Sequence, residues 1–257
     1  CKEMGFKPVA TRKNSVVVEI GGNGEPLVLA AHVDTLGAMV RGIKSSGRLR
    51  ITKIGGYPEN NIEGENCIIH TRLGKEFTGT IQMENPAVHV NKDIGKTERS
   101  DKNIEVVIDE LVSKKEDVEK IGISAGDFIT FDPRTIITKS GFIKSRHLDD
   151  KASAGVLLSL AKLVADSELK LTRKVYLLFT TYEEVGHGGA SGIPDDVEEM
   201  ISVDMGAVGD DLTTDEHKVS ICAKDSGGPY DYDVTTKLIN LAKDNKLNYA
   251  VDIYPHY

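Results

Sequence analysis

Four segments of the sequence are runs of mostly apolar residues that end in side chains able to bind a metal ion. Because the runs are nearly continuous rather than alternating, they are typical of strands covered on both faces, as in parallel sheets. They are shorter than the roughly 20 apolar residues that a membrane helix needs. The runs and the residues after them are Pro26–Ala31 with His32 and Asp34, Lys174–Tyr182 with Glu183 and Glu184, Glu199–Val203 with Asp204, and Tyr249–Tyr254 with His256.

Two further segments have the apolar spacing of amphipathic helices, Ala154–Ala165 and Asp233–Lys246. Asp149 and Asp150 precede the first, where acidic side chains suit the positive end of a helix dipole. Strands that alternate with helices predict an α/β fold with a mixed, mostly parallel sheet flanked by helices. The predicted buried stripe of the first helix consists of Val156, Leu160, Leu163 and Val164.

The middle of the chain has a different pattern, in which short alternating segments are separated by Gly, Asn and charged residues. This pattern predicts an inserted β-rich domain over residues 37–140, with one charged helix near Glu110–Ile121. Residues 1–36 and 141–257 would then form the α/β domain. The expected strands of the insertion are Ile62–Thr71, Thr78–Met83, Glu105–Asp109 and Asp127–Phe131.

The composition excludes several classes of partner. The chain has 257 residues and a net charge of −8, so its field repels nucleic acids and anionic membranes. Its three cysteines (Cys1, Cys67 and Cys222) are odd in number and lack metal-knuckle spacing, which favours a reducing compartment such as the cytoplasm. The sequence opens on Cys1 rather than Met, which indicates a fragment of a longer chain.

Side chains at the ends of parallel strands meet at one edge of a sheet, so the four runs would bring their polar residues together. Imidazoles and carboxylates without thiolates suit Zn²⁺, Co²⁺ or Mn²⁺. The set is too large for one zinc ion and fits two ions roughly 3.5–4 Å apart that share a carboxylate and a water. The candidate ligands are His32, Asp34, Asp149, Asp150, Glu183, Glu184, Asp204 and His256.

Each candidate alone has a simpler structural explanation. His32 could be a buried, hydrogen-bonded histidine, and Asp34 or Asp204 could start a turn. For Asp150 we prefer the interpretation that it caps the following helix. The metal hypothesis therefore depends on the joint placement of these residues.

Five motifs in order resemble the glutamyl/deblocking aminopeptidases, dinuclear metallopeptidases of the tetrahedral aminopeptidase type, some of which carry an endoglucanase label. The motifs are AAHVDTLGAMV, SRHLDDKASAGVLL, TTYEEVGHGGA, SVDMGA and YPHY. The resemblance covers nearly the whole chain and includes a β-rich insertion between the first two motifs. It implies a fold like that of zinc exopeptidases, peptide substrates, and a homo-oligomer from a dimer up to a dodecamer in which the insertion mediates subunit contact.

The resemblance also implies roles for individual residues. A hydroxide that bridges two divalent ions, Zn²⁺ or Co²⁺, would attack the peptide carbonyl while Glu183 acts as general base and Asp34 orients a ligand. The implied metal ligands are His32, Asp149 as the bridge, Glu184, Asp204 and His256. The sequence departs from the family pattern at His187 and Gly188, where a bulky residue and an arginine are expected, and at Lys151, which replaces an arginine.

Three other functions compete with a metal-dependent aminopeptidase. A glycosidase is disfavoured because the chain has no Trp and only 5% aromatic residues, and adjacent acids cannot easily flank one glycosidic bond. A related two-metal deacylase or dipeptidase would share the same ligands. A catalytically silent assembly subunit is disfavoured because the acid–base and ligand positions are all present.

Overall fold

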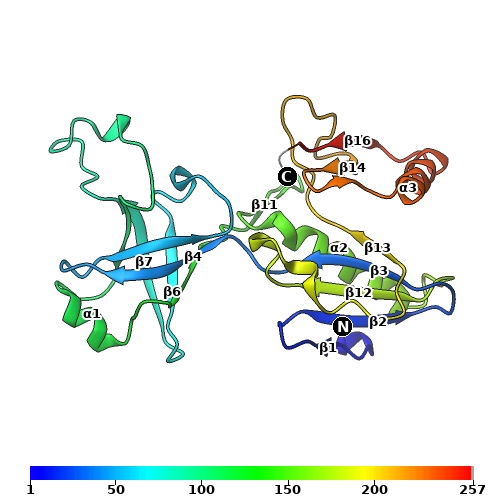
Figure 1. The fold of residues 1–257 in the computed structure, drawn as a ribbon, viewed down its shortest axis with the longest axis horizontal. Helices are drawn as coiled ribbons and strands as arrows, with labels where there is room; N and C mark the ends of the chain where they lie inside the picture. Colours follow the sequence, from blue (N-terminus) through cyan, green and yellow to red (C-terminus); the bar gives the residue numbers. More distant parts are fainter. Residues whose placement is uncertain (256–257) are drawn as a thin grey trace. The chain divides into compact units, whose positions relative to one another are not determined.

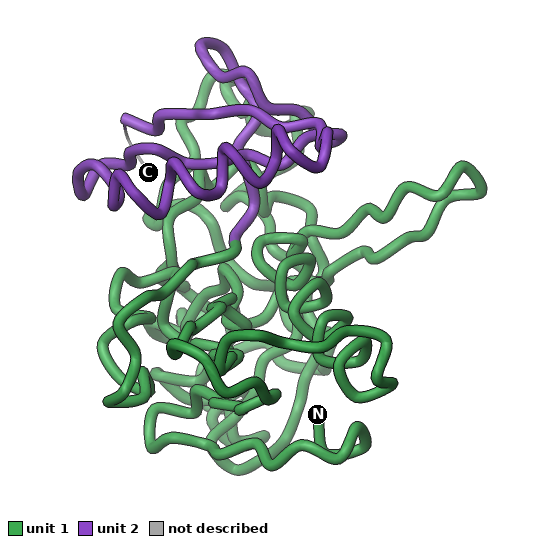
Figure 2. Tube along the Cα trace, turned by 90° about the vertical axis from the view of Figure 1, so that its right-hand side faces the viewer, with its two compact units in different colours: residues 1–203 green, residues 204–257 purple. Residues whose placement is uncertain are grey.

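The computed structural model describes residues 1–255, which form two units. The first unit consists of residues 1–203, and the second begins at Asp204 (Figure 2). Among the described residues, no helix is both long and apolar enough to cross a lipid bilayer.

The first unit contains a five-stranded sheet, the central sheet (Figure 1). Strands β12, β3 and β13 pair in parallel, whereas β2 pairs antiparallel with both β12 and β1. The predicted runs therefore form strands and the sheet is mixed as expected, but it is not mostly parallel, because its antiparallel pairings equal its parallel ones in number. In spatial order the strands are β1 (Val9–Ala10), β2 (Val16–Gly21), β12 (Val175–Thr180), β3 (Leu27–His32) and β13 (Glu199–Ser202).

Helix α2 (Leu148–Ala165) packs against one face of this sheet. Its buried stripe consists of Ala154, Leu157 and Ala161, together with Ser153 near its start. Half of the predicted stripe was wrong: Val156 is 60% exposed and Leu163 is 42% exposed. Leu160 and Val164 are partly buried against the core, as predicted. The alanines Ala154 and Ala161 let the helix approach the sheet closely, and Leu157 fills the space between them.

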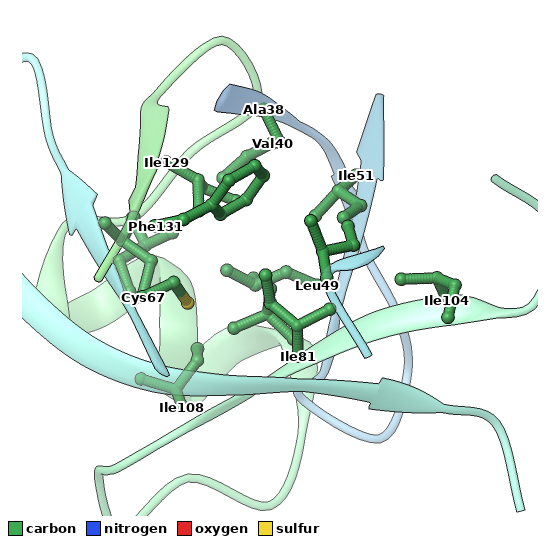
Figure 3. Packing of buried hydrophobic residues seen from close by; sticks show 14 of the residues in the cluster. Ala38, Val40, Leu49, Ile51, Cys67, Ile81, Ile104, Ile108, Ile129 and Phe131 are labelled. Carbon is green, nitrogen blue, oxygen red and sulfur yellow. The ribbon is translucent and has the colours of Figure 1, made fainter. Parts of the chain in front are cut away.

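Six antiparallel strands between β3 and α2 close into a barrel. Aliphatic side chains fill its interior, with Leu49 and Ile81 completely buried (Figure 3). This barrel is the β-rich region predicted for residues 37–140; its role as a separate domain stays a prediction. In barrel order the strands are β4 (Gly37–Ile43), β5 (Leu49–Ile54), β8 (Ile104–Ile108), β7 (Glu76–Met83), β6 (Asn66–His70) and β9 (Phe128–Phe131).

Shorter elements complete the first unit. Helix α1 (Lys115–Ile121) lies within the predicted charged helix and packs Val118 against the barrel core. Strands β10 (Ile136–Ile137) and β11 (Ile143–Lys144) form a two-stranded hairpin after the barrel. The 3₁₀ turns are η1 (Lys2–Met4), η2 (Glu59–Asn61), η3 (Ile94–Lys96), η4 (Glu183–Val185) and η5 (Gly188–Ala190).

The second unit contains a three-stranded sheet and one helix. Strand β14 (Val219–Asp225) pairs with β15 (Gly228–Pro229) and, in parallel, with β16 (Tyr249–Ile253). Helix α3 (Tyr232–Asp244) forms close to its predicted position, and the Asp231 carboxylate caps it by accepting a hydrogen bond from Val234 N. We expected all four apolar runs to share one sheet, but β16 belongs to this second sheet.

Candidate active site

Three segments of the first unit place their polar residues at the same end of the central sheet. His32 is the last residue of β3 and lies beside Thr180, the last residue of the neighbouring strand β12. Glu183 and Glu184 follow β12 in the turn η4, and Asp149 lies in the first turn of α2. Segments that are far apart in sequence therefore meet around the His32 ring.

The imidazole of His32 is buried, and acidic residues contact both of its ring nitrogens. Nε2 lies 2.9 Å from Oδ1 of Asp149 and 3.7 Å from Oε2 of Glu183. Nδ1 lies 3.0 Å from the main-chain oxygen of Asp34 and 3.5 Å from its carboxylate. A carbonyl and a carboxylate on one nitrogen fix the ring, which leaves the other nitrogen turned toward the acidic cluster.

Asp150 does not cap the helix, so our interpretation of this residue was wrong. Its side chain is 0% exposed, and its Oδ2 accepts a hydrogen bond from the main-chain amide of His32 at 3.0 Å. The peptide bond between Asp149 and Asp150 is cis, and both residues have non-helical backbone angles. Asp149 therefore contacts the ring of His32 while Asp150 holds its main chain.

Asp34 connects the end of β3 to the turn that carries the two glutamates. Its Oδ2 accepts a hydrogen bond from the main-chain amide of Glu184 at 3.2 Å. Burial acts to raise the pKa of Asp34, but hydrogen bonds from His32 and from the amides of Glu183 and Glu184 outweigh it, and the pKa is lowered. Asp34 is thus held as a carboxylate.

The pKa of Glu184 is shifted in the opposite direction to that of Asp34. Burial and the nearby negative charges of Asp149, Glu183 and Asp34 raise its pKa to about 7, although the charge of His32 opposes them. Its Oε1 is buried and has no hydrogen-bond partner among the described residues. Glu183 is more open, with a side chain that is 45% exposed.

These observations test whether the residues fit a divalent cation. Four carboxylates crowd one imidazole, and a buried carboxylate oxygen without a partner is costly unless a cation or a proton compensates it. Imidazole nitrogen and carboxylate oxygen are ligands that Zn²⁺ and Co²⁺ accept. The chemistry of these donors therefore fits a divalent cation beside His32 and Asp149, whose ligand atoms lie close enough to share one.

The other two predicted ligands do not belong to the first unit. Asp204 is the first residue of the second unit and directly follows Val203, whose amide donates a hydrogen bond to Ala30 O at 2.7 Å. His256 lies outside the described residues. Their roles as metal ligands stay predictions.

The sequence analysis named two further side chains but did not predict how they support this site. One is Asp150, and the other is Lys151, whose Nζ donates a hydrogen bond to the main-chain oxygen of Val33 between His32 and Asp34. The only sequence signal for either residue is its position within two residues of Asp149. A run of charged residues at a helix start is compatible with capping, and burial cannot be read from it.

The chain is similar in sequence to known aminopeptidases. Residues 14–257 match a family model described as M42 glutamyl aminopeptidase. The chain is 48% identical over 258 residues to YhfE of Bacillus subtilis, named as a candidate aminopeptidase, and the match covers 100% of this chain and 75% of YhfE. The chain spans about half the length of several more distant curated aminopeptidases.

Several solved structures with the same fold are described as peptidases, and one is described as an endoglucanase. A TET aminopeptidase from a thaumarchaeon superposes with a TM-score of 0.87 at 21% identity, covering 98% of this chain and 73% of that one. The TET1 peptidase of Pyrococcus horikoshii, described as able to assemble into a tetrahedron or a large octahedral shell, has a TM-score of 0.82 at 25% identity. The latter match covers 97% of this chain and 74% of TET1.

Proposed function

This chain belongs to the M42 glutamyl aminopeptidase family, and we propose on that premise that it removes amino-terminal residues from peptides with the aid of divalent metal ions. The family places the chain among the peptidases, which are hydrolases. The observation that carries the proposed metal dependence is the buried Oε1 of Glu184, which lacks a hydrogen-bond partner in a cluster of carboxylates. A cation would compensate that oxygen and the surrounding negative charge together.

The proposed centre holds two ions, either Zn²⁺ or Co²⁺. Asp149 is the proposed shared ligand, because its carboxylate contacts the His32 ring and its charge also acts on Glu184. Mixed imidazole and carboxylate ligands support either metal. The proposed ligand set is His32, Asp149, Glu184, Asp204 and His256.

Cations held by these residues would polarise the peptide carbonyl and acidify the attacking water. Glu183 is the proposed general base, because its half-exposed carboxylate reaches to 3.7 Å from His32 Nε2 and so can meet a water in front of the ligands. It takes the proton from the water and passes it to the departing amine. Asp34 is a positioning residue that fixes the His32 ring and the amide of Glu184.

We propose that the protein forms a homo-oligomer, between a dimer and a dodecamer, and that it acts in the cytoplasm. The assembly described for TET1 supports this proposal. Residues 37–140 would form the domain that makes subunit contacts and controls substrate access. Native mass spectrometry tests the oligomer: a monomer at micromolar concentration would contradict it.

A substrate comparison tests the proposed activity. The chain reconstituted with Zn²⁺ or Co²⁺ should hydrolyse amino-acid anilides that carry a free α-amine, and EDTA should abolish this hydrolysis. N-acetylated anilides and aryl glycosides serve as matched controls and should not react. Hydrolysis that survives EDTA would contradict metal dependence, and equal hydrolysis of the N-acetylated anilides would contradict an aminopeptidase.

A further inference from the structure

We propose that Lys13 is a positioning residue that clamps the turn carrying Glu183. The inference rests on the proposed function, in which Glu183 is the general base. Lys13 lies in the turn between β1 and β2, more than 160 residues away in sequence from the residues that it contacts.

The turn that carries Glu183 is closed at its two ends. The amide of His187 donates a hydrogen bond to Tyr182 O at 3.1 Å, and inside this loop the amide of Gly186 donates to Glu183 O at 2.7 Å. The rings of Tyr182 and His187 stack, with centroids 5.0 Å apart and an angle of 26° between their planes. Tyr182 enters the turn with a φ of 67°, in the left-handed region. Residues 182–187 therefore form one small closed loop.

Lys13 contacts both ends of this loop. Its Nζ donates a hydrogen bond to the main-chain oxygen of His187 and lies 5.3 Å from the centroid of the Tyr182 ring. Its main-chain oxygen accepts a hydrogen bond from Thr181 Oγ1 at 2.7 Å. One residue thus fixes the entry of the loop, its exit and the ring between them.

Apart from the hydrogen bond of the Glu184 amide to Asp34 and the close approach of Gly188 to Glu183, the loop has little support from packing. Tyr182 and Val185 are 47% and 44% exposed, and Glu183, Gly186 and His187 are also exposed. A segment with few buried apolar contacts opens locally at low cost unless specific contacts hold it. Because the Nζ of Lys13 already donates to His187 O, we infer that Lys13 acts through the loop rather than by contact with substrate.

The test compares Lys13→Met with Lys7→Met, a matched control. Lys7 is exposed, lies in the same amino-terminal segment, and makes no side-chain hydrogen bond or ion pair among the described residues. Hydrogen exchange of a peptide covering residues 181–188 should be about tenfold faster in Lys13→Met than in wild type, and unchanged in Lys7→Met. Exchange elsewhere in the first unit should stay the same.

Kinetics provide the second readout. Lys13→Met should lower kcat about tenfold with KM changed less than about twofold, since a displaced base weakens the chemical step rather than substrate binding. Bound metal should be unchanged, and Lys13→Arg should restore most of kcat because it keeps a cationic donor. In a Tyr182→Asn background, where Asn tolerates the positive φ, Lys13→Met should have a smaller effect.

The two proposals fail in different ways. Exchange in Lys13→Met equal to that in Lys7→Met overturns the clamp, whether or not the protein is active. Faster exchange with wild-type kcat overturns the positioning role. A reconstituted wild type without aminopeptidase activity overturns the proposed function, while the exchange experiment still decides whether Lys13 holds the loop.

Discussion

The carboxylate of Asp150 accepts a hydrogen bond from the main-chain amide of His32 at 3.0 Å, although 118 residues separate the two in the sequence. His32 is the last residue of β3, and both side chains are almost completely buried. A buried amide needs an acceptor, and at this position Asp150 supplies it. The pair therefore determines where the His32 ring meets Asp149.

Replacement of Asp150 tests this relationship. Asp150→Ala leaves the His32 amide buried without its acceptor, so the free energy of unfolding of the metal-free protein should fall by about 1–3 kcal/mol. Asp150→Asn keeps an acceptor oxygen, so its free energy of unfolding should fall less than that of Asp150→Ala. Urea unfolding measures the effect, with the exposed Asp195→Ala as control. Equal stability of Asp150→Ala and the control would contradict the role of this hydrogen bond.

Two adjacent glycines give a matched test of the packing around Glu183. A Cβ at Gly188 would lie 3.1 Å from both the Cα and the Cβ of Glu183, whereas a Cβ at Gly189 would meet nothing within 4 Å. Gly188→Ala should displace Glu183 and lower kcat about tenfold or more, with bound metal retained. Gly189→Ala should have wild-type kinetics. Steady-state assays with an amino-acid anilide distinguish the two outcomes, and similar kcat values for both variants would refute the account.

Glu184 should destabilise the metal-free protein and stabilise the metal-bound one. Glu184→Gln removes a negative charge from beside Asp149 and Glu183, so at pH 8 in EDTA the variant should unfold at higher urea concentration than wild type. It should also lose most of the stabilisation that Zn²⁺ gives wild type, about 2.7 kcal/mol at a hundredfold excess over Kd.

The exposed residue Glu198 provides the control for this experiment, because Glu198→Gln makes the same chemical change away from the cluster. The control should unfold as wild type does under both conditions. If Glu184→Gln is stabilised by Zn²⁺ as strongly as wild type, Glu184 is not a ligand.

The buried carboxylate of Asp252, in the second unit, should make the stability of the protein depend on pH. Burial would raise the pKa of Asp252, but hydrogen bonds from Thr213 and Ser220 hold it below the ordinary value of 3.8. Its stabilising contribution is therefore complete above pH 3.8 and is lost as the pH falls through the lower folded pKa. Between pH 6 and pH 3, wild type should lose more unfolding free energy than Asp252→Asn. Urea titrations measure this, and the exposed Asp210→Asn should behave like wild type.

The strands of the central sheet could be predicted from the sequence because their burial on both faces requires continuous apolar residues. Strands β3, β12 and β13 begin and end within two residues of the predicted runs. Since chain direction and strand order bring their carboxyl ends together, the proximity of His32 to Glu183 also followed. Five ordered motifs gave the family, which the family model confirms.

The features that could not be predicted are contacts between segments far apart in the sequence, which a local pattern of residues does not specify. The apolar run of β16 correctly predicts a strand. Its pairing with β14 could not be deduced, so the prediction that β16 belongs to the central sheet was wrong. The spacing of the larger apolar residues placed Leu160 and Val164 correctly on the buried side of the helix, but it missed Ala154 and Ala161, which close packing on the sheet buries. Asp150 shows the same limit, since only the folded chain reveals which amide a buried carboxylate meets.

The central claim is that Glu183 moves a proton at a centre whose metal ions are held by its neighbours. The most direct measurement is the kcat of Glu183→Gln for an amino-acid anilide, together with the number of bound metal ions by elemental analysis. We predict that turnover falls by at least about a hundredfold while two ions remain bound to each chain. Turnover close to that of wild type, with the ions retained, would contradict the assignment of Glu183 as the base.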